Sequence, residues 1–165
     1  MRREDVVDVA AIAAQREGTT VDRWRGVFER LCGESERSVV LVATLGDAVV
    51  AYGKAEHFTP PAGSAANVTP EGWYLGGVVV RPEHRRRGIG TALTRERMRW
   101  LAERTSVVYY IANERNRVSI ELHAALGFEE RTRDFVHPGV SFEGGVGILF
   151  ACDLPPRTPA PRAEA

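Results

Sequence analysis

The chain has 165 residues, of which 44% are hydrophobic and 27% are charged, a composition typical of one globular domain. Lys and Arg total 22, as do Asp and Glu, so no net charge draws the chain to nucleic acid or an acidic membrane. No apolar run approaches the roughly 18 residues that a membrane-spanning helix needs. We expect a single domain over residues 1–154 and a Pro-rich, disordered tail over residues 155–165.

The cysteine content is low. Only Cys32 and Cys152 occur, far apart in the sequence, and neither has a His or Cys partner at a zinc-type spacing. We therefore expect no disulfide framework and no metal site, and a protein of the reducing cytoplasm.

The first half of the chain changes its hydrophobic period once. Apolar residues first recur every three or four positions, which predicts two amphipathic helices that end at Gly18 and Gly33. Short apolar runs around the Gly46-Asp47 turn then predict a hairpin, and a Pro- and Gly-rich stretch follows that is typical of a binding loop or a disordered one. The predicted elements are helices at 5–15 and 20–33, strands at 39–43 and 48–58, and a loop at 59–72.

The second half alternates strands with helices. The strand over residues 73–80 carries Gly76 and Gly77 in its middle, where glycines indicate a bulge or a close backbone approach. Gly127 is suited to end the last helix. The further predicted elements are helices at 90–104 and 116–126 and strands at 107–111, 128–136 and 147–154.

The segment between the strand at 73–80 and the helix at 90–104 reads Arg85-Arg86-Arg87-Gly88-Ile89-Gly90. Gly88 and Gly90 let the backbone turn tightly, so successive N–H groups can point at one place, and the helix N-terminus adds its dipole. The arginine side chains add positive charge nearby. This pattern predicts an anion cradle for phosphate.

Three other readings of the same segment are weaker. A nucleoside triphosphate P-loop needs a lysine after its last glycine, and none follows Gly90. A dinucleotide-binding turn needs a third glycine where this chain has Leu93. An arginine run can also be a solvated face, and a nucleic-acid site built on it is disfavoured by the zero net charge.

A second pattern lies further along the chain: Asn116, then His123 seven residues later, then Gly127-Phe128. With both patterns at this separation, the chain resembles the GNAT family of acyl-CoA-dependent N-acetyltransferases over about residues 36–136. The family's nucleotide motif, Arg or Gln, two residues, Gly, one residue, Gly or Ala, is met by Arg85, Gly88 and Gly90. The second motif departs from the family at His123, where a tyrosine is usual.

The resemblance implies an α/β (α+β) fold with a mixed, mostly antiparallel sheet of about six strands and about four helices. The strands would be splayed at Val78–Val80 against residues 107–111 to admit coenzyme A. The family usually opens with a strand, for which Met1–Glu4 leaves no room. We therefore expect the sheet to lack that edge, and a second copy covering it would give a homodimer.

The resemblance also implies acetyl-CoA as cofactor, with its pyrophosphate on the loop and its pantetheine arm alongside the splayed strand. Gly76-Gly77 fits the bulge that separates the strands. Asn113 and Asn116 would bond the cofactor amides, although both are equally suited to helix capping. The predicted cofactor-binding residues are Val78, Val79, Val80, Arg85, Arg86, Arg87, Gly88, Ile89, Gly90, Thr91, Asn113, Asn116 and Ser119.

The activity implied is acetyl transfer to a primary amine of a small molecule by direct attack. His123 stands in the place of the tyrosine that protonates the thiolate, or is a packed histidine that only bounds the pocket. Tyr74 stands where many relatives carry the base carboxylate. Glu71 is an alternative base, as is Glu56 beside His57. These two departures also leave open a non-catalytic acyl-CoA-binding sensor of the same fold.

Overall fold

The structure is a computed structural model that describes residues 1–34 and 36–155. Of the predicted tail, all but Pro155 lies outside the described residues. No helix in the described part is both long and apolar enough to cross a membrane. The elements in chain order are α1 (Val6–Glu17), α2 (Val21–Gly33), β1 (Ser38–Leu45), β2 (Ala48–Phe58), β3 (Gly72–Val80), α3 (Ile89–Leu101), β4 (Val107–Asn113), α4 (Arg117–Ala124), β5 (Glu129–Thr132) and β6 (Gly147–Asp153), with short 3-10 helices at Arg3–Asp5 and Pro82–His84.

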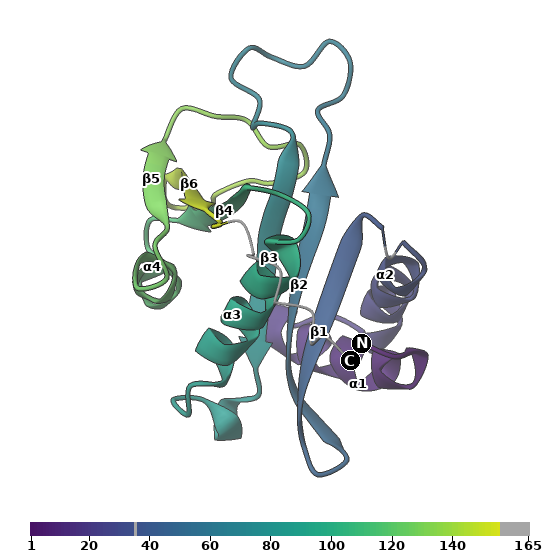
Figure 1. Cartoon of the computed structure of the whole chain (residues 1–165). Coiled ribbons are helices and arrows are strands. Elements are labelled where there is room, and N and C mark those ends of the chain that lie inside the picture. Colours follow the sequence, from purple (N-terminus) through teal and green to yellow (C-terminus); the bar gives the residue numbers. More distant parts are fainter. Residues whose placement is uncertain (35, 156–165) are drawn as a thin grey trace, which may run out of the picture.

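The strands form one six-stranded sheet in the order β1-β2-β3-β4-β6-β5. Only the β3–β4 pair is parallel, and the other four pairs are antiparallel. Helices α1 and α2 lie together beside β1 and β2, whereas α3 and α4 lie across the sheet from them (Figure 1). The predicted fold class, a mostly antiparallel sheet of six strands with four helices, is confirmed.

Each face of the sheet has its own hydrophobic core. On the first face, Phe28 of α2 contacts Tyr52 of β2 edge to face, with ring centroids 5.1 Å apart. On the second face, Leu101 of α3 and Val108 of β4 are fully buried. The period-2 alternation of β2 and β3 between these cores fixes which side chains each strand shows to which helices.

The parallel pair is short. Trp73, Tyr74 and Leu75 pair with residues 108–110, and β3 has no further pairing with β4. β4 meanwhile stays paired with β6 as far as Asn113. The predicted splay is confirmed, but its predicted extent on β4 was wrong, because the register with β3 keeps residues 108–110 paired and separation begins at Ile111.

A bulge lies at the point where the strands separate. In the β2–β3 register, Gly53 faces Val78 and Ala55 faces Leu75, so Gly76 and Gly77 together oppose a single residue of β2, Lys54. This confirms the bulge predicted from the paired glycines.

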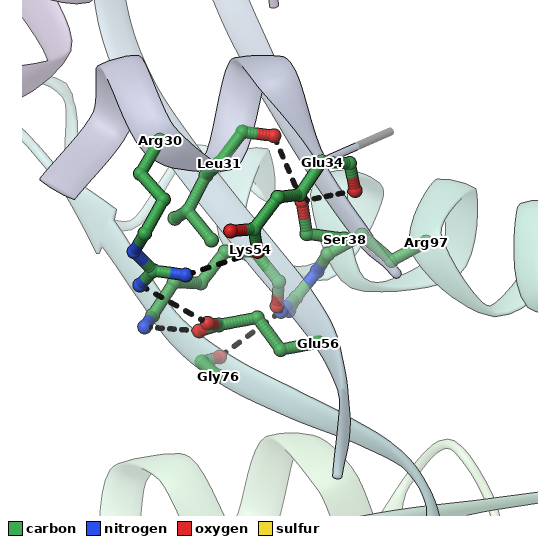
Figure 2. A network of polar contacts seen from close by, with 8 residues as sticks. All are labelled: Arg30, Leu31, Glu34, Ser38, Lys54, Glu56, Gly76 and Arg97. Carbon is green, nitrogen blue, oxygen red and sulfur yellow. Dashed lines mark hydrogen bonds and ion pairs between the residues drawn. The ribbon is translucent and has the colours of Figure 1, made fainter. Parts of the chain in front are cut away.

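A buried arginine from α3 completes the bulge. Arg97, which is 0% exposed, donates from Nη1 to the carbonyl of Lys54 at 2.6 Å and to that of Gly76 at 3.0 Å (Figure 2). The bulge deprives these two carbonyls of their regular hydrogen-bond donors on the neighbouring strand, and the guanidinium donates hydrogen bonds in their place.

One strand is shorter than predicted. β5 ends at Thr132 rather than at Val136, because the chain turns there and the Asp134 N–H donates to Thr132 Oγ1 at 3.0 Å. Val136 instead forms an isolated parallel bridge with Val68, which ties down the loop over residues 59–72. The outer edge of β1 receives one hydrogen bond, from the Met1 ammonium to the Val40 carbonyl at 2.7 Å.

Candidate active site

The loop before α3 leaves a run of backbone N–H groups without backbone partners among the described residues. Arg86 and Gly88 adopt left-handed conformations, with φ of 61° and 76°. The first N–H of the helix with a backbone partner is that of Ala92, which donates to the Gly88 carbonyl at 2.9 Å. The N–H groups of residues 86–91 come before it in the chain. Left-handed residues spaced as Arg86 and Gly88 are here can gather successive N–H groups around an anion.

The arginines of this loop have different surroundings. Arg85 Nε donates to the Val80 carbonyl at 3.1 Å, which ties the start of the loop to the end of β3. Arg86 and Arg87 are exposed. The loop therefore combines fixed backbone donors with free positive charge, which suits a pyrophosphate.

A cavity of about 400 Å³, the crossing cavity, lies where β3 and β4 separate. Residues of both sheet faces line it, so it passes between the strands. Its walls include Trp24 and Tyr52 on the α1–α2 side and Ser119 and His123 on the α4 side. The edge of β3 that faces it has no strand partner after Leu75 within the described residues. A free strand edge is what an extended amide-containing arm requires.

The α4 wall holds a small polar cluster. The Tyr110 hydroxyl donates to Ser119 Oγ at 2.6 Å, and the Tyr110 ring stacks on His123 with centroids 3.8 Å apart. Asn116 is the N-cap of α4, its side chain accepting from the Ser119 N–H at 3.3 Å. The capping reading of Asn116 is thus confirmed, and Asn116 still lines the crossing cavity.

His123 is neutral in this cluster. Burial lowers the pKa of His123 from 6.5 to about 4, against a weaker opposing effect of the Ser119 carbonyl and with nearby Arg97 lowering it further. Nδ1 lies 2.8 Å from the Ser119 carbonyl, so Nδ1 carries the proton. Nε2 is buried and has no partner among the described residues. The neutral ring therefore offers a hydrogen-bond acceptor at Nε2.

A second cavity of about 500 Å³, the aromatic cavity, adjoins the crossing cavity where β3 and β4 separate. It shares Lys54, Leu75, Gly76, Ile111 and Asn116 with the crossing cavity. Its further lining residues include Phe58, Tyr74, His137 and Phe142 together with the acids Glu56 and Glu143.

The predicted base residues lie in different surroundings. Tyr74 lines the aromatic cavity, but its hydroxyl donates to the Pro70 carbonyl at 2.7 Å, and burial raises the pKa of Tyr74 to about 12. Glu71 accepts from the Thr59 hydroxyl at 3.0 Å and lines neither cavity. Asn113 lines only the aromatic cavity of the two, and its Oδ1 accepts from the Arg115 N–H at 2.9 Å. The catalytic roles of Tyr74 and Glu71 stay predictions.

Sequence reasoning missed Lys54 and Arg97 as site residues. Lys54 lines both cavities, and Arg97 holds the bulge between them. Lys54 is the single lysine among 22 Lys and Arg residues, which does not by itself mark it as a site residue. Arg97 did carry a signal. Arg97 stands four residues after Leu93 and four before Leu101, on the buried stripe of α3.

Comparison with known proteins assigns the chain to a family. Residues 6–128 match the profile of the Acetyltransferase (GNAT) family. A comparison with curated proteins found no significant match.

Solved structures share the fold. A ribosomal-protein-alanine N-acetyltransferase from Brucella melitensis has 23% identity and a TM-score of 0.71, over 93% of this chain and 97% of that one. The PaiA N-acetyltransferase from Thermoplasma acidophilum, in complex with coenzyme A, has 13% identity and a TM-score of 0.66, over 93% and 95%. At these identities the structures show the fold, whereas the family profile covers most of the sequence. The resemblance seen in the two motifs is confirmed: this chain belongs to the GNAT family of acetyltransferases and is an acyltransferase.

Proposed function

We propose that this protein transfers the acetyl group of acetyl-CoA to a primary amine of a small molecule, by direct attack when both are bound. The observation that carries the proposal is the crossing cavity, which passes through the sheet at the splay and so connects the α4 side to the α1–α2 side. A donor and an acceptor can thereby meet from opposite faces without a covalent enzyme intermediate.

The residues around the splay fit acetyl-CoA. The N–H groups over residues 86–91 would hold the pyrophosphate, and the free edge of β3 at Val78–Val80 would pair with the pantetheine amides. A Cβ at Gly90 would lie 3.5 Å from Val78 Cγ1 and 3.6 Å from Leu122 Cδ1, which are ordinary packing distances, so the backbone at Gly90 lies close to both β3 and the segment of α4. Bound there, acetyl-CoA would supply the thioester, and an N–H of Val79 or Val80 would stabilise charge on its oxygen.

The aromatic cavity fits the acceptor. Phe58, Tyr74 and Phe142 present aromatic surface, and Glu56 and Glu143 present carboxylates. Aromatic faces and carboxylates both favour a cationic amine. Glu56 is the base that this arrangement favours, because its carboxylate is half-buried in the cavity wall.

Two neighbouring side chains are candidates for protonating the departing thiolate, and they differ in whether a proton is available. His123 stands at the position of the usual acid, but in its neutral form Nε2 accepts a hydrogen bond and has no proton to give. Ser119 accepts from Tyr110, which leaves the Ser119 hydroxyl proton directed to another acceptor, and Ser119 lines the crossing cavity. Comparing His123→Phe with Ser119→Ala in a thiol-release assay separates the routes, because each variant leaves the other group in place.

The first experiment is thermal unfolding with acetyl-CoA, CoA and ATP in parallel. A ligand at about 100 times its dissociation constant adds about 2.7 kcal/mol to the native state. We expect stabilisation by acetyl-CoA and CoA and none by ATP. Absence of any shift with acetyl-CoA would remove the cofactor assignment.

The second experiment measures thiol release with a panel of aromatic and aliphatic amines. The panel includes a peptide with an N-terminal alanine, because one structural neighbour is named for that activity. Release with a small amine supports the proposed acceptor class, and release with the peptide alone replaces it by a protein substrate. Binding without release from any amine supports the sensor.

The same proposal extends to location and assembly. The two free cysteines of the described chain fit the reducing cytoplasm, where acetyl-CoA is available. A second copy pairing along β1 would give a homodimer, and light scattering at two protein concentrations tests it.

A further inference from the structure

Lys54 lies at the junction of the two cavities. It opposes the bulge of β3, and a Cβ added at Gly76 would lie 2.8 Å from Lys54 Cγ and 2.9 Å from its Cε. The lysine chain therefore runs directly over Gly76, in space that only glycine leaves free. From there it lines both the crossing cavity and the aromatic cavity.

The ammonium of Lys54 has a carboxylate partner. Lys54 Nζ lies 2.5 Å from Glu56 Oε1, and the other oxygen of Glu56 lies 3.9 Å from Arg30 of α2 (Figure 2). Figure 2 shows these three side chains converging beside Gly76. The side chains of Lys54 and Glu56 are 24% and 35% exposed, so the pair is partly shielded from water. A primary amine with a proton acceptor thus already stands where the acceptor cavity meets the splay.

We infer that the protein acetylates its own Lys54 when acetyl-CoA is bound and no acceptor amine is present. The inference rests on the proposed function, since the thioester must occupy the crossing cavity. Glu56 takes one proton from the Lys54 ammonium, and the neutral Nζ attacks the thioester carbonyl carbon. The N–C bond forms and the C–S bond breaks; the second nitrogen proton goes to the thiolate, giving free CoA thiol, and Glu56 releases its proton to water.

The product alters both cavities. An acetylated Lys54 has no charge, so its ion pair with Glu56 is lost, and the added acetyl group fills space between the donor and acceptor sides. Acetylation therefore slows turnover of an external amine. A bound acceptor protects Lys54 because it takes the same position.

The test is to incubate the full chain with acetyl-CoA alone and to measure intact mass and the modified residue by peptide mapping. We expect a gain of one acetyl group on Lys54, none in Lys54→Arg, and slower modification when CoA is added in excess. The matched control is Arg99→Lys, which places a second lysine beside Glu96 on the exposed face of α3, away from both cavities. Lys54 should react at least about 100-fold faster than the amine introduced by R99K, in line with general base catalysis and positioning.

The outcomes separate this inference from the proposed function. If acetyl-CoA raises the unfolding temperature but Lys54 gains no acetyl group, or gains it no faster than the control position, self-acetylation is overturned and the cofactor assignment stands. If acetyl-CoA neither stabilises the protein nor releases thiol with any amine, the proposed function fails as well. Modification of the N-terminal amine in preference to Lys54 also overturns the inference.

Discussion

The loop over residues 85–91 and the bulge at Gly76–Gly77 both interrupt regular structure beside β3, and they treat their backbone polar groups in opposite ways. The loop leaves the N–H groups of residues 86–91 without backbone partners in the described part of the chain. The bulge has its carbonyls at Lys54 and Gly76 bonded by a buried arginine from another element. Consecutive residues are enough to build a ligand-facing site, whereas an interior break in a sheet needs a partner brought by the tertiary fold.

Arg97→Met makes the largest expected change. It leaves the two carbonyls buried without donors, at about 1–3 kcal/mol each. We expect the free energy of unfolding to fall by about 3–5 kcal/mol in urea titrations, with Arg97→Lys in between because one nitrogen can bond only part of the set. A loss below about 1 kcal/mol would show that water replaces the guanidinium and that the bulge does not depend on α3.

Gly76→Ala and Gly77→Ala form a matched pair within the bulge. A Cβ at Gly76 collides with the stem of Lys54, whereas a Cβ at Gly77 meets nothing within 4 Å. Overpacking of this kind costs about 1–3 kcal/mol, so Gly76→Ala should lower the free energy of unfolding by that amount and displace Lys54 from the cavities. Gly77→Ala should stay within about 0.5 kcal/mol of wild type. Equal losses in both variants would contradict the crowding by Lys54.

His123 combines the two situations, because its Nδ1 has a hydrogen-bond partner, as the bulge carbonyls do, whereas its Nε2 has none among the described residues, just as the loop N–H groups have no backbone partner. With a pKa of about 4 in the folded chain against 6.5 ordinarily, the unfolded chain binds more protons between these pH values. The free energy of unfolding therefore falls as pH falls from 6.5 to 4, by at most about 1.4 kcal/mol per pH unit from this group. His123→Phe should flatten that slope in urea titrations across pH 4.5–7.5. Parallel curves for the two proteins would mean that His123 is not held neutral.

Substitutions at Gly88 and Gly90 should change the free energy of unfolding least. Gly88 has a φ of 76°, so Gly88→Ala is strained and should lower the free energy of unfolding by about 1 kcal/mol. Gly90 lies in α3 with only ordinary contacts around its added Cβ, so Gly90→Ala should leave stability unchanged or raise it by a few tenths of a kcal/mol. Titration with acetyl-CoA should nevertheless show about tenfold weaker binding by Gly90→Ala, a difference of about 1.4 kcal/mol. Unchanged affinity would mean that the glycine is not there for a ligand.

Local features were open to prediction from the sequence. The turn at Gly18, the bulge at Gly76–Gly77 and the loop over residues 85–91 each depend on a few consecutive residues, and glycines in the sequence indicate their backbone freedom directly. The alternation of hydrophobic period likewise placed the α-helices and strands of the described residues, though not the two short 3-10 helices, and the two motifs identified the family. Element ends were less accurate, as at Thr132, because a hydrogen bond from the Asp134 N–H to the Thr132 hydroxyl decided where β5 stops.

The properties of the site's side chains were decided by partners from distant parts of the chain. His123 is neutral because β4 and α4 bury it against Tyr110, and Tyr74 donates to Pro70 rather than into the cavity because the loop over residues 59–72 folds back on it. The solitary Lys54 gave no sign of its carboxylate partner or its two cavities until β2 met the bulge of β3. Sequence thus determined the backbone sites and the family, while burial and long-range contact, which no local pattern encodes, determined which side chains hold protons and face the cavities.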